Sequence, residues 1–193
     1  MRNDIVLAGV GGQGILTIAA IVGRAAVSRG LNVKQSEVHG MAQRGGSVSA
    51  HLRLSDQAIL SDLIAPGSAD IVLSMEPMEA LRQMPYLGAK GVLVSNTVSI
   101  CNIEQYPEQE ELLAELRRAP EHLLIDADSM AKEAGSSRAA NMVLLGALAN
   151  CLDLDKDLLS SSMAQFFASK GDKVLQSNLA AFQAGAACHA SKQ

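Results

Sequence analysis

Two glycine-rich segments near the start of the chain carry the residue types of an anion-binding site. The first reads Gly-Val-Gly-Gly-Gln-Gly over residues 9–14 and fits the GxGxxG pattern between an apolar run and a helical pattern. Glycines permit a tight turn and a close approach of the backbone to a ligand, and a helix N-terminus favours a phosphate group. We expect a phosphate or other anion site, with a purely structural turn as the alternative, and its candidate residues are Gly9, Gly11, Gly12, Gln13 and Gly14.

The second segment runs over residues 37–47 and reads Glu-Val-His-Gly-Met-Ala-Gln-Arg-Gly-Gly-Ser. Its arginine offers a planar guanidinium for carboxylate or phosphate, and its histidine can exchange a proton near neutral pH. Because loops that follow parallel strands gather at one edge of a sheet, this segment is predicted to lie near the first one. Its candidate binding residues are Glu37, His39, Arg44, Gly45 and Gly46, with a solvated turn as the alternative.

The glycine loop permits some nucleotide-binding interpretations and excludes others. A P-loop is excluded because Ile15-Leu16 stands where that motif needs Lys-Ser/Thr. An NAD site stays open because Glu37 lies near the end of the second predicted strand, where dinucleotide folds carry an acid. Tyr86-x-x-x-Lys90 has the spacing of a catalytic pair, but a proline and two glycines break the helix that it requires. No GxSxG or HExxH motif occurs and the four histidines show no metal-ligand spacing, so no catalytic residue or metal site is assigned.

The composition limits the classes of partner. With 193 residues, of which 48% are hydrophobic, the chain is predicted to form a single domain over residues 1–193. It carries 16 Lys+Arg and 20 Asp+Glu, five aromatic residues and no Trp, a balance that excludes a dedicated nucleic-acid binder. Residues 1–54 carry six basic and two acidic residues, or +4, and residues 55–193 carry ten and eighteen, or −8. This asymmetry indicates an anion site in the first part, with random drift of surface charge as the alternative.

The cysteine spacing and the hydropathy of the chain indicate in which cellular compartment the protein is expected. Cys101, Cys151 and Cys188 stand far apart without a CxxC pair, which is typical of reduced thiols in the cytoplasm. Three thiols are too few for a usual iron–sulfur cluster, so any cluster must be held by another chain. The stretch Ile5–Gly23 has no charge over 19 residues, but its five glycines favour a strand, a turn and a helix over a membrane span. We expect a cytoplasmic protein without a membrane partner.

Short apolar runs alternate with helical patterns along the chain. This alternation predicts a three-layer α/β/α fold with a mostly parallel, Rossmann-like sheet and a helical C-terminal third. Strands are expected at 5–8, 31–36, 47–54, 71–74, 92–95 and 123–125, with 37–46 as a loop and glycines 88 and 91 between strands. Helices are expected at 13–29, 78–83, 129–134, 137–151 (capped by Ser136 or Ser137), 156–169 and 172–187, and within 108–118. Residues 47–54 alternate between apolar and polar, so their strand should be half-polar and lie at an edge or run antiparallel.

Together, the two glycine segments resemble a known family. Residues 9–15 and 37–47 resemble the gamma-type domain of 2-oxoacid:ferredoxin oxidoreductases, and the His-Gly-Met-Ala-Gln-Arg-Gly-Gly form is similar to the small (beta) subunit of its indolepyruvate branch. The likeness continues through residues 75–81, 141–147 and 178–182, so it covers essentially the whole chain.

The resemblance implies a heteromeric enzyme that oxidatively decarboxylates a 2-oxo acid, such as pyruvate or an arylpyruvate, with coenzyme A. The products would be an acyl-CoA, carbon dioxide and reduced ferredoxin. It further implies that a large partner subunit holds thiamine diphosphate and the iron–sulfur clusters and reduces ferredoxin, while this chain binds no cofactor alone and is inactive alone. Two alternatives stay open, namely a stand-alone NAD-binding Rossmann oxidoreductase and a non-catalytic nucleotide-binding module.

Overall fold

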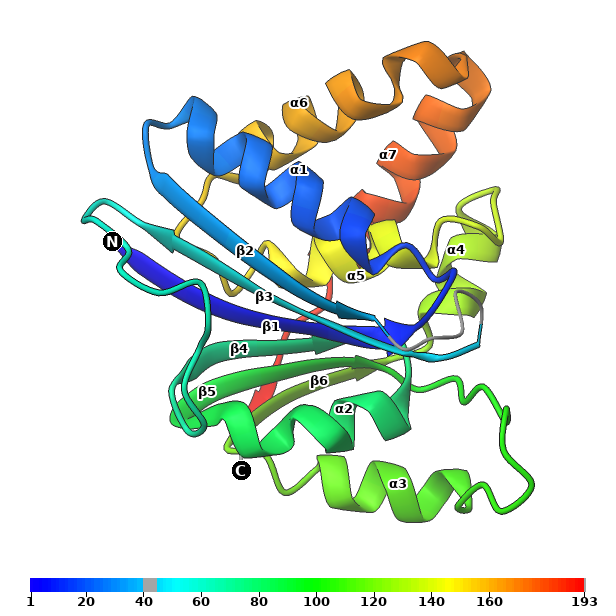
Figure 1. The fold of residues 1–193 in the computed structure, drawn as a ribbon. Coiled ribbons are helices and arrows are strands. Elements are labelled where there is room, and N and C mark those ends of the chain that lie inside the picture. Colours follow the sequence, from blue (N-terminus) through cyan, green and yellow to red (C-terminus); the bar gives the residue numbers. More distant parts are fainter. Residues whose placement is uncertain (40–44, 193) are drawn as a thin grey trace.

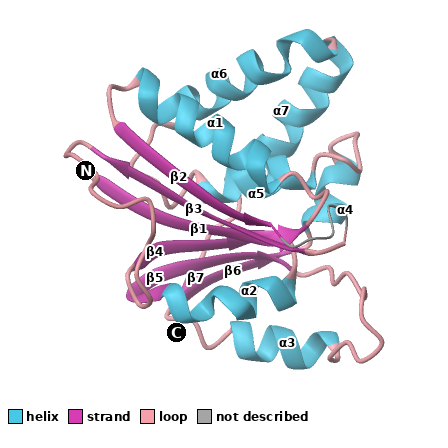
Figure 2. Ribbon diagram, in the orientation of Figure 1, coloured by secondary structure: helices cyan, strands magenta, loops and turns pink. Residues whose placement is uncertain are grey.

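A mixed β-sheet forms the centre of the molecule (Figures 1 and 2). The computed structural model describes residues 1–39 and 45–192, and within these the strand order is β2-β3-β1-β4-β5-β6-β7. Strands β1, β4, β5 and β6 pair in parallel, whereas β3 is antiparallel to β1 and β2, and β7 is antiparallel to β6. The strands are β1 (Arg2–Val10), β2 (Asn32–His39), β3 (Ser47–Ser55), β4 (Ala69–Ser74), β5 (Leu87–Asn96), β6 (Glu121–Ile125) and β7 (Ser191–Lys192).

Helices cover both faces of the sheet, which confirms the three-layer prediction. One layer holds α1 (Ile15–Ser28), α4 (Ala127–Glu133), α5 (Ala140–Leu148), α6 (Lys156–Phe167) and α7 (Asp172–Ala186). The other holds α2 (Pro77–Gln83) and α3 (Gln109–Leu116). Successive residues of β1 serve the two layers in turn, since Ile5 and Leu7 belong to the larger core and Val6 to the smaller one.

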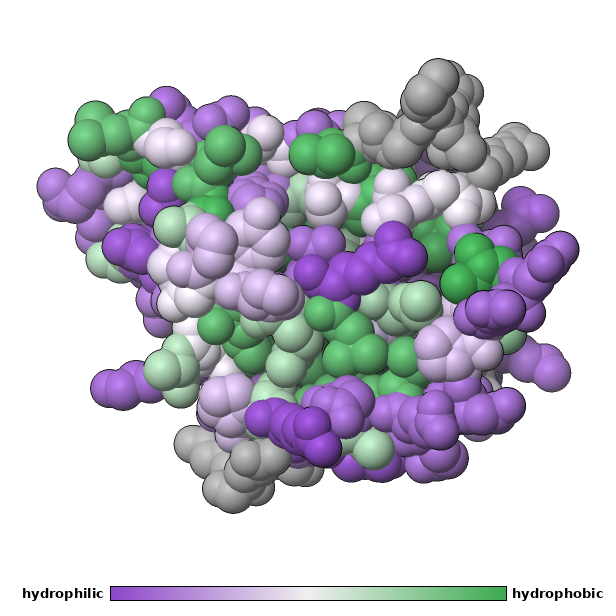
Figure 3. Space-filling view, turned by 60° about the horizontal axis from the view of Figure 1, so that its bottom comes forward, coloured by the Kyte–Doolittle hydropathy of each residue, from purple (hydrophilic) through white to green (hydrophobic). Residues whose placement is uncertain are grey.

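The two helical layers differ in how tightly they are built. Helices α5 and α7 pack backbone against backbone, because a Cβ on Gly146 would lie 2.0 Å from the carbonyl oxygen of Phe182. In the other layer, a surface cavity of about 460 Å³ lies between α2 and α3 and is lined by residues that include Leu81 and Leu112. Figure 3 shows the side of the molecule that lies at the bottom of Figure 1, with apolar side chains exposed between polar rims. None of the helices in the described ranges is long and apolar enough to cross a bilayer.

The half-polar strand is β3, and its position decides between the two expectations. Val48, Ala50, Leu52 and Leu54 are buried on the face toward α1, as the alternation predicts. The strand lies between β2 and β1 and is antiparallel to both, so the antiparallel expectation is correct and the edge expectation is wrong. Its polar face is covered mainly by the chain's own residues 56–64, as described below.

Several boundaries differ from those predicted from the sequence. Strand β2 continues to His39 instead of ending at Ser36, because its ladder with β3 pairs Glu37 with Ala50 and His39 with Val48. Strand β5 begins at Leu87, so both glycines that were expected between strands lie inside it. The Tyr86-x-x-x-Lys90 spacing has no helical meaning, since Tyr86 ends a 3-10 turn and Lys90 lies in β5.

The predicted serine cap of α5 is also wrong. The helix begins after Ala139, which has no side-chain cap, and the hydroxyl of Ser136 accepts a hydrogen bond from the amide of Arg138 instead. The buried apolar side chains of α5 stabilise its position without a cap, because eight of its nine residues are buried. The two-residue strand β7 was not predicted at all, since such a short segment carries no periodicity.

Candidate functional site

The carboxyl ends of β1 and β4 form the point where the chain changes from one face of the sheet to the other. After β1 the chain enters α1 on one face, and after the neighbouring β4 it enters α2 on the opposite face (Figure 1). In open α/β sheets a crevice for ligands lies at such a switch point. We call this region the crevice end, and the opposite end of the sheet, where β1 begins, the far end.

The first glycine loop spans the gap between β1 and α1. Gly14 begins the helix with φ +82°, and a Cβ there would lie 2.5 Å from Nδ2 of Asn141 in α5. The positive φ favours glycine at this position, and any Cβ there would have to displace the side-chain amide of Asn141. Gln13 does not face a ligand in this structure, because its Oε1 accepts from the amide of Val10 at 2.6 Å and its Nε2 donates to the carbonyl of Met75 at 3.1 Å. Gln13 thus joins β1 to the end of β4.

The two glycine segments meet, as the sequence predicts. The amide of Gly11 donates to the carbonyl of Gly46 at 2.8 Å, and the amide of Gly45 donates to the carbonyl of Gly11 at 3.4 Å. Because the carbonyl of Gly46 occupies the amide of Gly11, the first loop has one fewer amide available to an anion than its motif suggests. His39 lies at the end of β2 opposite Val48, and Arg44 lies outside the described residues.

Two cavities flank the contact between the glycine segments. The first, of about 320 Å³, lies beside the N-terminal turn of α1 and is lined by Val10, Gly11, Gly12, Gly14, Ile15, Leu16, Thr17 and Val48. The second, of about 180 Å³, lies beside α2 and is lined by Val10, Gly45, Ser47, Glu76, Met78, Glu79, Arg82, Asn102, Ile103 and Tyr106. The first offers helix-terminal amides and apolar walls, which suit a phosphate joined to an apolar group. The second is the more polar of the two.

Sequence reasoning missed the polar residues of the second cavity. Glu76 and Glu79 are 1% and 5% exposed, and the hydroxyl of Ser47 donates to Oε2 of Glu79 at 2.5 Å. Glu76 caps α2 by accepting from the amide of Glu79 at 2.9 Å. A Glu-Pro pair directly after an apolar strand, with Glu three residues later, is a helix-start signal that could have marked this position.

Glu37 does not occupy the place that an NAD site requires. It lies on β2, which β3 separates from β1, whereas the acid of a dinucleotide fold stands on the strand next to the glycine loop. Its carboxylate accepts a hydrogen bond from Gln35 on the same strand. The structure therefore leaves Glu37 apart from Gly9, Gly12 and Gly14.

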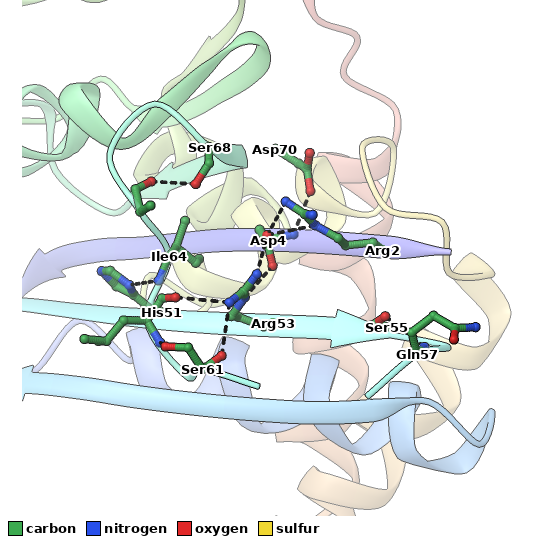
Figure 4. A network of polar contacts seen from close by, with 12 residues as sticks. Arg2, Asp4, His51, Arg53, Ser55, Gln57, Ser61, Ile64, Ser68 and Asp70 are labelled. Carbon is green, nitrogen blue, oxygen red and sulfur yellow. Dashed lines mark hydrogen bonds and ion pairs between the residues drawn. The ribbon is translucent and has the colours of Figure 1, made fainter. Parts of the chain in front are cut away.

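Two of the six basic residues in residues 1–54, Arg2 and Arg53, bind a buried carboxylate at the far end (Figure 4). The carboxylate of Asp4, 1% exposed, binds Arg53 in a bidentate manner at 2.7 and 2.9 Å and binds Arg2 at 2.8 Å. Arg53 also donates to the carbonyls of Ser61 and Leu63 at 3.0 and 3.1 Å. The hydrogen bond to Asp4 stabilises the charged guanidinium and so raises the pKa of Arg53.

The polar face of β3 is closed by the same network. The amide of Ile64 donates to Nδ1 of His51 at 2.9 Å, and the ring of Tyr86 packs edge-on against the imidazole. A cavity of about 570 Å³ remains beside this network, but its arginines already bind Asp4 and backbone carbonyls. Arg2 and Arg53 thus account for part of the charge asymmetry through an internal network, and an anion site in the first part of the chain stays a prediction.

Comparison with known proteins decides the family. The model of the family described as pyruvate ferredoxin/flavodoxin oxidoreductase matches residues 4–188. The chain belongs to this family. It is 38% identical over 194 residues to the indolepyruvate oxidoreductase subunit IorB of Methanothermobacter thermautotrophicus, covering 96% of both chains. It is also 43% identical over 155 residues to the IorB subunit of Archaeoglobus fulgidus, covering 77% of this chain and 76% of that one.

Solved structures of this family share the fold. The pyruvate oxidoreductase subunit PORC of Thermotoga maritima superposes with a TM-score of 0.75 at 19% identity and covers 99% of both chains. The 2-oxoglutarate:ferredoxin oxidoreductase of Magnetococcus marinus, solved with 2-oxoglutarate, coenzyme A and succinyl-CoA bound, superposes with a TM-score of 0.77 at 23% identity. The match covers 96% of this chain but only 30% of that larger chain. The relatives are named as oxidoreductase subunits, which favours the subunit prediction over the stand-alone NAD enzyme and the non-catalytic module.

Proposed function

We propose that this chain is the small, non-cofactor subunit of a 2-oxoacid:ferredoxin oxidoreductase that acts on indolepyruvate or another arylpyruvate. The complex would cleave the bond between the carboxylate and the keto carbon, release carbon dioxide, transfer the acyl group to coenzyme A and pass the electrons to ferredoxin. The observation that carries the proposal is the similarity to an indolepyruvate oxidoreductase subunit over 96% of both chains.

The cofactors belong to the partner in this proposal. Thiamine diphosphate is assigned to the large subunit because the family resemblance implies it. The iron–sulfur clusters are assigned there as well, because this chain has three cysteines and a usual cluster needs four thiolates. All three are free thiols: Cys101 is exposed before α3, whereas Cys151 and Cys188 follow the neighbouring helices α5 and α7. Burial raises the pKa of Cys151 to about 11, so this thiol stays protonated at neutral pH. Free thiols are also what supports the cytoplasm as its location.

The crevice end is the part of the chain that we assign to coenzyme A and the partner. Coenzyme A carries phosphates and a long, mostly neutral arm, and the cavity of about 320 Å³ beside α1 combines a helix N-terminus with apolar walls. Gly9, Gly11, Gly12, Gln13 and Gly14 shape this cavity or hold its loop in place. His39, Arg44, Gly45 and Gly46 belong to the segment that meets it, with Arg44 as the proposed charge for a phosphate.

Co-expression with a large subunit of the same family tests this function. The purified complex is assayed by viologen reduction with indolepyruvate, phenylpyruvate, pyruvate and 2-oxoglutarate, each with and without coenzyme A. We expect reduction only when both chains and coenzyme A are present, with arylpyruvates giving the largest kcat/KM. Equal reduction without this chain would refute the subunit assignment, and a preference for 2-oxoglutarate would refute the substrate assignment.

A separate titration tests the NAD alternative. The isolated chain is titrated with NADH and followed by the fluorescence of the nicotinamide ring. We expect no saturable binding up to millimolar NADH, because Glu37 lies two strands away from the glycine loop. Micromolar binding would restore the dinucleotide interpretation.

A further inference from the structure

The carboxyl group of Glu76 does more than cap a helix. One oxygen, Oε2, accepts from the amide of Glu79 and completes the N-terminus of α2. The other oxygen, Oε1, accepts from the hydroxyl of Tyr106 and from the amide of Ile100, the latter at 3.4 Å. Serine, threonine, aspartate and asparagine are the usual caps, so capping alone does not explain a glutamate. Its longer side chain is explained by the second set of contacts, which reach a different segment.

That segment is the connection between β5 and α3, residues 97–108, which has no regular secondary structure. Glu76 binds it at Ile100 and again at Tyr106. Between these two points, Nδ2 of Asn102 donates to the carbonyl of Gly45 at 2.7 Å. The buried carboxyl group of Glu76 therefore anchors the connection. The connection in turn binds the end of the second glycine segment through Asn102.

The contacts form a continuous path to the first glycine loop. Gly45 and Gly46 exchange hydrogen bonds with Gly11, as described above. The path therefore runs from Glu76 through the 97–108 connection and Asn102 to Gly45, and from there to Gly11. The side chains of Glu76, Asn102 and Tyr106 also line the cavity of about 180 Å³. A displacement of the connection changes the wall of this cavity and the contact between the glycine segments together.

The hydroxyl of Tyr106 stays protonated over the whole physiological pH range. Burial and the hydrogen bond to Glu76 both raise the pKa of Tyr106, so its hydroxyl remains a donor. The hydroxyl reaches Glu76 across the crevice end, and its removal leaves the aromatic ring in place. Tyr106 is therefore the position where the path can be broken with the smallest change in packing.

We propose that Glu76 is a positioning residue for the crevice end: acting through Tyr106 and Asn102, it holds Gly45 and Gly46 against Gly11 and so sets the shape of the cavities on both sides. Glu76 does not itself contact the reacting atoms. The kinetic consequence rests on the proposed function, because it requires coenzyme A to bind at this end, whereas the structural consequence does not depend on it.

The kinetic test uses the reconstituted complex with Tyr106→Phe. We expect the KM for coenzyme A to rise about fivefold while kcat and the KM for the 2-oxo acid stay within about twofold, since a loosened wall weakens binding without removing a reacting group. Tyr86→Phe is the matched control, because it removes a hydroxyl from the other tyrosine of the chain, at the opposite end of α2, and should leave all three constants unchanged. An equal rise in the KM for coenzyme A in both variants would overturn the proposal.

A double-mutant cycle shows whether the effect travels along the path. Asn102→Ala should raise the KM for coenzyme A to a similar extent as Tyr106→Phe, and the two together should have little more effect than either alone. Fully additive effects would mean that the two residues act independently, which contradicts a path from Glu76 to Gly45.

The structural test needs no partner and no substrate. In the isolated chain, amide exchange followed by NMR should become at least tenfold faster at Gly11 in Tyr106→Phe, because the Gly46 carbonyl that protects it is held less firmly. The amides of β4 should keep their wild-type rates. Unchanged exchange at Gly11 would overturn the positioning role. Faster exchange together with an unchanged KM for coenzyme A would retain that role and refute only the assignment of coenzyme A to this end.

Discussion

The two ends of the sheet both contain a buried carboxyl group that fastens a loop, but the partners of the two groups differ. At the far end, Asp4 is bound by the guanidinium groups of Arg2 and Arg53, and Arg53 in turn binds the segment over β3. At the crevice end, Glu76 accepts from two backbone amides and the hydroxyl of Tyr106. Both carboxyl groups belong to residues that are 1% exposed.

This difference indicates that the far end contributes mainly to stability and that the crevice end is the part available for binding. The far end pairs its charges within the chain and covers the polar face of β3, so those residues have completed their bonding. The crevice end holds its loops with neutral donors and leaves two cavities open beside the glycine segments. Loss of a paired charge at the far end should therefore lower stability without changing binding, and loss of a hydrogen-bonding side chain at the crevice end should change binding.

Asp4→Ala should give the largest loss of stability. It leaves two guanidinium groups without their carboxylate, and the Arg53 side chain is only 19% exposed. Removing one partner of a buried pair typically costs about 3 kcal/mol or more, and we expect about 3 kcal/mol in chemical denaturation. The folded variant should keep the KM for coenzyme A of the wild-type complex.

An exposed ion pair provides the control for this prediction. Glu115→Ala, near the end of α3, removes the partner of Arg118, which lies just after the helix. Both side chains are largely exposed, so the loss should cost about 0.5 kcal/mol or less. A similar small loss for Asp4→Ala would show that the far-end network does not stabilise the fold.

Gly14→Ala should give an intermediate loss of stability at the crevice end. The left-handed conformation costs alanine about 1 to 2 kcal/mol, and the new Cβ would lie too close to Asn141. We expect about 2 kcal/mol for this variant and about 1 kcal/mol for Gly12→Ala, whose φ is +103° but whose Cβ would meet nothing within 4 Å. If the contact with Asn141 causes the larger loss of stability in Gly14→Ala, then adding Asn141→Ala should reduce that loss to the value for Gly12→Ala. An unreduced loss would contradict this cause.

The smallest effect should be a dependence of stability on pH at the far end. Burial lowers the pKa of His51 from 6.5, with a further lowering by Arg53 that Asp62 opposes. A pKa that is lower in the folded chain gives a contribution to stability that is complete above about pH 6.5 and is lost as the pH falls below it. The wild type should therefore lose more stability than His51→Phe between about pH 7.5 and pH 5.5. Equal losses in the two proteins would show that His51 titrates as it does in the unfolded chain.

The sequence predicted the fold well where the hydrophobic periodicity is strong and glycine or other turn-forming residues mark the ends of elements. The apolar run before the glycine loop, the alternation of Val48, Ala50, Leu52 and Leu54, and the helical C-terminal third all lie where the pattern indicates. It could not show that Glu37 and His39 continue a strand, because only the ladder with β3 extends β2 through polar residues. Nor could it predict β7, which exists only through pairing with β6.

The candidate site, like the fold, could be predicted from the sequence only in part. The meeting of the two glycine segments follows from the rule that loops gather at the carboxyl ends of parallel strands, and Gly11 and Gly46 confirm it. The roles of Glu76 and Tyr106 depend on contacts between residues 30 positions apart, for which a single sequence holds no signal. The net charge of residues 1–54 could not show which arginines pair inside the chain, since the partner of Arg53 is known only from the fold.

One pair of variants tests most directly that the crevice end, and not the far end, faces coenzyme A. Gly12 and Gly67 lie at the crevice end and the far end, both have positive φ, and a Cβ on either would meet nothing within 4 Å. Gly12→Asp and Gly67→Asp therefore place the same negative charge at opposite ends, and Gly12→Asn separates the charge from the change of backbone. The measurement is the KM for coenzyme A in the reconstituted complex. We predict a rise of about tenfold for Gly12→Asp alone, from repulsion of the phosphates, whereas equal KM values for Gly12→Asp and Gly67→Asp would contradict the account.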